Sequence, residues 1–195
     1  MGQNYTPIVV TAPTIEPITS AELKAQSRIT TDADDTLISR IITVARQQCE
    51  LIAERILIDT VFDLYADAFP AQFVLPRTPV DSVTAITYTD TDGTTQTVAS
   101  TVYTLDADHI PARVYPAFEQ SWPTDIRAIN KAVKIRWKAG YGTATTDVPE
   151  HMRHAVLLLA AHYYENREAF TVELLKQVPL GVRDLLAIDG RITVD

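Results

Sequence analysis

The sequence has one cysteine, no long apolar run and no excess of positive charge, and each absence excludes a class of protein. Cys49 alone cannot form an internal disulfide, and its place on the apolar side of a predicted helix favours an inert buried thiol. The purest apolar run, residues 155–161, is far shorter than the roughly 20 residues that cross a membrane. A formal net charge of −8 disfavours wrapping of nucleic acid or binding to anionic membranes.

Catalytic motifs are also lacking. No serine lies in a nucleophile elbow, and the Gly140–Gly142 turn is not followed by the Lys-Ser/Thr of a phosphate loop. His151, His154 and His162 share helical spacing, so a metal-dependent hydrolase is one hypothesis, although no HExxH pattern accompanies them. We predict a protein that is not an enzyme and has no metal or other cofactor.

The first third of the chain predicts an extended arm and two helices. Residues 1–17 contain three prolines and almost no charge. Thr19 and Glu22 then form a capping box, which predicts a short helix ending near residue 27. An acidic turn precedes a second helix of about 20 residues, in which apolar residues recur every three or four positions from Leu37 to Ile56.

The middle of the chain is rich in β-branched and aromatic residues. Asp90-Thr91-Asp92-Gly93 joins two alternating runs and predicts a hairpin. Strands are expected at 61–65, 73–75, 83–88, 102–105, 112–115 and 133–138. After the 139–142 turn, the pattern predicts a long helix over 149–168, a shorter one around 172–176 and a last turn or helix over 179–188.

Helices and strands occur in separate blocks, which is typical of an α+β fold. The simplest arrangement is a small helical bundle, formed by residues 18–56 and 149–188, with an inserted antiparallel β-subdomain at 57–138. Residues 1–17 would be an N-terminal arm, and residues 189–195 a C-terminal tail.

The helix predicted over 149–168 is apolar on more than one side. Residues from Met152 to Tyr163 form one stripe, and a second apolar side is formed by Leu157, Leu158, Ala161 and Tyr164. A surface helix needs only one such stripe. We therefore expect the second side to contact a neighbouring subunit.

A basic segment from Arg127 to Lys138 follows a strongly acidic region. Lys134, Arg136 and Lys138 lie on one face of a predicted strand. One interpretation is a strip that meets DNA, as in a DNA-binding packaging accessory protein. The alternatives are pairing with acids on neighbouring strands or pairing between subunits.

Six short motifs, taken in order, resemble one known family. They are residues 16–24 (EPITSAELK), an acidic turn before Leu37-Ile38, 73–80 (FVLPRTPV), 139–142 (AGYG), 149–168 ending in YENRE, and 178–186 (VPLGVRDLL). In this order they are similar to the head–tail connector, or adaptor, proteins of tailed bacteriophages. The resemblance covers residues 16–188.

The resemblance implies a structural protein of the virion head–tail junction, made in the bacterial host cytoplasm. Such proteins form a ring of about twelve subunits that binds the portal and the next tail-side connector or stopper protein. DNA passes through the ring without specific binding. The implied portal-contacting arm is Val178, Leu180, Val182, Arg183, Leu185, Leu186 and Arg191. The sequence departs from the resemblance at 188–195, which lacks a basic, aromatic ending.

Overall fold

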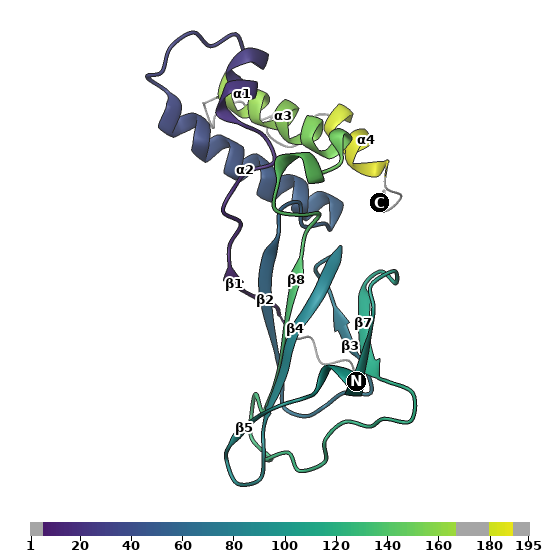
Figure 1. Ribbon diagram of the computed structural model, residues 1–195. Coiled ribbons are helices and arrows are strands. Elements are labelled where there is room, and N and C mark those ends of the chain that lie inside the picture. Colours follow the sequence, from purple (N-terminus) through teal and green to yellow (C-terminus); the bar gives the residue numbers. More distant parts are fainter. Residues whose placement is uncertain (1–5, 167–179, 189–195) are drawn as a thin grey trace. The chain divides into compact units, whose positions relative to one another are not determined.

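The computed structural model describes residues 6–166 and 180–188, and the chain divides into two compact units (Figure 1). One unit comprises residues 1–13 and 59–140 and contains the strands. The other comprises residues 14–58 and 141–195 and contains the α-helices. The combination of helices with antiparallel sheets confirms the predicted α+β class.

The helical unit begins with α1 (Ser20–Gln26), whose capping box is present as predicted. The Thr19 hydroxyl accepts from the Glu22 amide at 3.2 Å, and the Glu22 carboxylate accepts from the Thr19 amide at 2.6 Å. Helix α2 (Asp35–Ala53) follows the acidic turn. It ends where Glu54 adopts a left-handed conformation, with φ of 54°.

Helix α3 (Glu150–Glu165) packs against α1, α2 and α4 (Leu180–Ala187). It ends at Glu165, and residues 167–168 and the short helix expected at 172–176 lie outside the described residues. The four α-helices that the structure describes share one apolar core, which includes Leu23, Ile38, Ile42, Cys49, Met152, Val156, Leu159, Val182 and Leu186.

The strand unit contains two antiparallel sheets, and the strands predicted from the sequence are all present. The larger sheet has the order β1-β2-β8-β4-β5 (Figure 1). The smaller sheet has the order β3-β7-β6. Their bounds are β1 Ile8–Thr11, β2 Thr60–Ala66, β3 Phe73–Leu75, β4 Val80–Thr89, β5 Thr95–Thr97, β6 Tyr103–Asp106, β7 Ala112–Pro116 and β8 Val133–Ala139. The segment expected as an extended arm thus contributes an edge strand, β1, paired with β2.

The β4–β5 hairpin confirms the predicted turn at residues 90–93. The Asp90 carboxylate accepts from the Thr94 amide at 2.8 Å and from the Gln96 side chain at 2.7 Å. Gly93 adopts φ of 89°, a conformation that side chains disfavour. The hairpin therefore accounts for the side chain of Asp90.

Strand β8 lies at the centre of the larger sheet, between β2 and β4. Its Val133, Ile135 and Trp137 are fully buried, and the Trp137 ring stacks on Phe62 of β2 with centroids 5.5 Å apart. The opposite face of β8 carries the basic side chains. The period-two pattern of residues 133–138 therefore correctly predicted both the buried face and the charged face.

Candidate interaction surfaces

The basic face of β8 is largely neutralised by acids of its own sheet. Arg136 makes a bidentate contact with Asp63 on β2, with both N–O distances 2.7 Å. Lys138 contacts Asp81 at 2.8 Å and Asp59 at 3.1 Å. The sequence left three alternatives open for these bases. For two of the three, Arg136 and Lys138, the contacts match pairing within the sheet.

These contacts also shift the pKa values of their members. The hydrogen bond with Asp63 raises the pKa of Arg136, and hydrogen bonds with Asp81 and Asp59 raise that of Lys138. The same contact lowers the pKa of Asp81. Each shift favours the charged forms, so the ion pairs persist at neutral pH.

The remaining bases of the segment are less engaged. Lys134 has no ion-pair partner in the described part of the chain. Lys131 lies over the Tyr65 ring, 5.4 Å from its centroid, and its amide donates to Asp67. The structure therefore leaves a scattered set of cations rather than a continuous basic strip.

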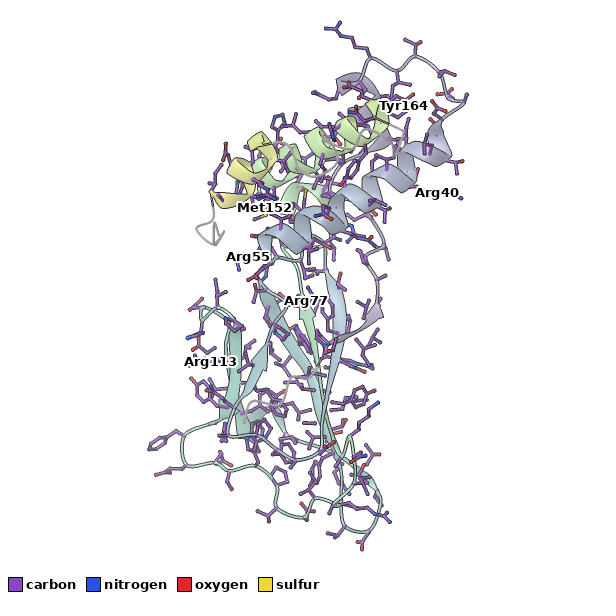
Figure 2. All side chains as sticks on the ribbon, turned by 180° about the vertical axis from the view of Figure 1, so that it is seen from behind. Arg40, Arg55, Arg77, Arg113, Met152 and Tyr164 are labelled. Atoms are coloured by element: carbon purple, nitrogen blue, oxygen red, sulfur yellow. The ribbon has the colours of Figure 1, made fainter. Side chains whose placement is uncertain are left out.

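Helix α3 is covered by its own chain on more than one side. Ala161 is 8% exposed, and Leu157 and Leu158 are half-buried against the helical core. Tyr164 of α3 (Figure 2) is also half-buried. Its hydroxyl donates to the Asp34 carboxylate at 2.7 Å. The part of the proposed subunit-contact side that stays accessible is the outer surface of Leu157, Leu158 and Tyr164.

The predicted portal arm is divided between buried and exposed positions. Val182 and Leu186 are buried in the helical core, while Arg183 is exposed and Leu185 is half-buried. Val178, Arg191 and the Leu180 side chain lie outside what the structure describes. Among the arm residues that the structure describes, Arg183 is therefore the charged one, and its side chain is exposed.

A buried ion cluster on α2 was not predicted from the sequence. Arg46 is 7% exposed and binds Glu16 at 2.7 Å and Glu50 at 2.8 Å. The Glu16 carboxylate also accepts from the Thr43 hydroxyl at 2.8 Å, and Glu50 accepts from the Leu57 amide at 3.0 Å. The cluster ties the segment before α1 and the segment after α2 to the middle of α2.

Glu50 provides a pH-dependent contribution to stability. Burial raises its pKa above the ordinary value of 4.5, although Arg46 and the Leu57 amide oppose the shift. The folded state therefore binds a proton at a pH where the unfolded chain has lost it, and stability from this group increases as pH falls. That gain is complete below the unfolded value and is lost as pH rises through the folded value. Groups with lowered pKa values have the opposite effect. The stability that the Asp81 carboxylate contributes is lost as pH falls below its ordinary value of 3.8.

We expect the free energy of unfolding of wild type, relative to that of Glu50→Gln, to increase as pH falls from neutral toward the ordinary carboxyl value of 4.5. Glutamine retains an acceptor for the Leu57 amide but cannot titrate. Urea unfolding at several pH values, followed by circular dichroism, measures the difference. The exposed Glu165→Gln is the control, and an equal pH slope in both variants would contradict the assignment.

The three histidines of α3 are not gathered into a site. Within residues 6–166 and 180–188, no three His, Cys, Asp or Glu side chains are placed to hold a metal ion. The backbone carbonyl of His162 accepts from Asn166 at the helix end. In the same described ranges, no helix has both the length and the apolar character needed to cross a bilayer.

Several large apolar side chains are exposed, and sequence reasoning did not single them out. Phe118 is 89% exposed, and Leu51 and Val44 of α2 are 64% and 52% exposed. Ile8 and Val9 of the edge strand β1 are each about half exposed. Because an isolated exposed side chain is normal on a protein surface, such residues indicate contacts only where a complementary surface is present.

The comparison with family models decides which family these features belong to. The model of the "Phage gp6-like head-tail connector protein" family matches residues 18–121, which is more than half of the chain. The chain belongs to this family. The resemblance seen in the sequence motifs is thereby confirmed, and the protein is a structural connector. No curated protein matches the sequence.

Solved structures of gene transfer agent (GTA) particles resemble the connector over nearly its whole length. The neck of the empty GTA particle, computed with C6 symmetry, contains a chain with a TM-score of 0.78 and 26% identity. The native GTA virion gives 0.75 and 26%, and the native GTA neck, computed with C12 symmetry, gives 0.71 and 27%. In each case the match covers 97% of both chains.

Proposed function

We propose that the connector forms a ring of about twelve copies at the head–tail junction of a virion, binds the portal and lets DNA pass during completion of packaging and ejection. The observation that carries this proposal is the likeness, over 97% of the chain, to chains of particle necks solved with sixfold and twelvefold symmetry. Head-to-tail contacts between identical subunits close into a ring when the rotation between them permits.

Two surfaces are proposed for the contacts of this ring. The C-terminal segment 178–195 would bind the portal, with Arg183 available on the exposed side of α4. The accessible parts of Leu157, Leu158 and Tyr164 on α3 would contact a neighbouring copy. A stopper protein on the tail side would bind the opposite rim of the ring.

Electron microscopy of the purified connector mixed with portal from the same particle tests the proposal. We expect a coaxial ring of connector copies beneath the portal. Arg183→Glu should reduce the fraction of portal particles that carry connector. The fold should stay intact, because the Arg183 side chain is exposed. A chain that stays monomeric at high concentration with portal present would overturn the proposal.

The protein as a whole is suited to let DNA slide rather than bind it. Its net charge is −8, and Arg136 and Lys138 are paired with acids of the sheet. We therefore expect no saturable binding of duplex DNA up to about 100 µM at physiological salt, the weak end of non-specific binding. Fluorescence anisotropy measures this.

The rival DNA-binding function predicts a different result. It requires measurable affinity that falls steeply with salt and decreases when Lys134, the unpaired base of β8, is replaced by alanine. Val74→Ala, an exposed change on another sheet, is the control. Salt-dependent binding lost in Lys134→Ala but kept in Val74→Ala would favour the packaging accessory function instead.

A further inference from the structure

Phe118 is presented at the tip of a fixed turn. The Gln120 amide donates to the Ala117 carbonyl at 2.9 Å, and the Ala117 amide donates to the Val102 carbonyl at 2.9 Å. Glu119 occupies the third turn position with φ of 60°, where glycine or asparagine is normally preferred. The turn therefore holds an 89% exposed aromatic ring beside a carboxylate, at a cost in backbone strain of about 1 kcal/mol or more.

The helical unit carries a pocket of matching chemistry. It has a volume of about 220 Å³ and is lined by Arg40, Ile41 and Val44 of α2 and by Tyr163 of α3. Its lining is apolar, so Arg40 contributes its hydrocarbon stem and leaves its guanidinium at the rim. It is an open depression on the surface rather than an enclosed cavity. An enclosed cavity of about 150 Å³ accepts a benzene ring, so the depression offers room for a phenyl side chain that is covered on one side only.

The charges beside the two features are complementary. Arg40 projects outward from α2 (Figure 2), and Glu119 is exposed next to Phe118. Neither has an ion-pair partner among the residues that the structure describes. A ring that enters the pocket would bring the Glu119 carboxylate toward the guanidinium. The cation would also lie near an aromatic face, which adds attraction.

We propose that Phe118 of one copy inserts into the Arg40–Ile41–Val44–Tyr163 pocket of the next copy, with Glu119 paired to Arg40 of that copy. This inference rests on the proposed ring and names a second contact between its subunits, in addition to the α3 surface of Leu157, Leu158 and Tyr164. Phe118 and the pocket lie on different surfaces of the same chain, so the contact between copies is head-to-tail. Contacts of this type can close into a ring. A buried aromatic anchor with a charged pair at its rim has the usual composition of an interface hot spot.

The test is the assembly of full-length variants, measured by analytical ultracentrifugation alone and by electron microscopy with portal. Phe118→Ala should raise the protein concentration at which half of the chains are assembled roughly 30-fold. This is the effect of losing one hot-spot side chain. Val44→Glu should have a similar effect, because it places a charge in the pocket. The controls are Ile129→Ala in the same connection and Leu51→Glu, a more exposed apolar position on the same helix.

A charge exchange distinguishes a direct contact from a general loss of fold. Arg40→Glu and Glu119→Lys should each weaken assembly, and the double variant should regain most of it. If wild type assembles but Phe118→Ala and Val44→Glu assemble equally well, this contact is overturned and the proposed function stands. If wild type forms no ring even with portal, the proposed function fails, and this inference fails with it. If Phe118→Ala lowers the melting temperature of the monomer, the phenyl side chain packs within its own chain. The proposed contact is then also overturned.

Discussion

Replacing Arg46 with alanine should lower the free energy of unfolding by about 3–5 kcal/mol. Arg46 is 7% exposed and is the shared partner of Glu16 and Glu50. Its removal leaves two carboxylates near each other without a counter-ion. One of them, Glu50, already has a pKa raised by burial. Circular dichroism of the helices during urea unfolding measures the loss.

Matched variants separate this loss from a simple helix effect. Arg40→Ala changes the same residue type on the same helix at an exposed position, so its cost should stay within about 0.5 kcal/mol. The triple variant Glu16→Gln, Arg46→Met, Glu50→Gln should recover most of the stability, because no unpaired charge remains. An Arg46→Ala protein as stable as Arg40→Ala would show that the cluster contributes little.

The Arg46 cluster also illustrates what the sequence could not predict. Arg46 comes four positions after Ile42 and three before Cys49, so helical spacing places it beside the apolar stripe of α2. Its partner Glu16 lies 30 positions earlier in the chain, and no local periodicity reveals that pairing. Similarly, Val182 and Leu186 form an apolar face that the pattern identifies, but only the packing of α4 on the helical core shows what that face contacts.

Local signals predicted the elements that depend on local physics. The capping box of α1 and the hairpin at Gly93 both form through hydrogen bonds between residues close in sequence. Strand β8 was predicted because alternation reports burial of one face. Strand β1 has only four residues, all exposed, and is held by pairing with β2, about 50 positions later. Its sequence therefore has no alternation to read.

The candidate surfaces were predicted only where they depend on residues close in sequence. The basic residues of β8 were correctly placed on one face, but their partners Asp63 and Asp81 lie on the two neighbouring strands, so neutralisation depended on register. The exposure of Phe118 follows from the backbone of the turn, where Glu119 takes a conformation rare for its type. Family likeness supplied the functional interpretation that these patterns alone did not.

Replacing Trp137 with alanine should destabilise the strand unit by about 3–5 kcal/mol, the range for deleting a large buried aromatic side chain. Trp137 is 0% exposed at the centre of the five-stranded sheet and stacks on Phe62. The remaining tryptophan, Trp122, lies in the same unit within a cluster containing Phe69 and Phe73. Its fluorescence during urea unfolding therefore follows the unit that was changed.

Trp137→Phe provides the control that identifies the cause. Phenylalanine retains stacking on Phe62 and removes the indole N–H, which has no acceptor among the described residues. The cost should fall to about 1–2 kcal/mol, because the lost volume is smaller and an unpaired buried donor disappears. Equal costs for the two variants would mean that the ring does not fill the core as described. A large loss in alanine alone would establish that the packing of this large side chain stabilises the strand unit.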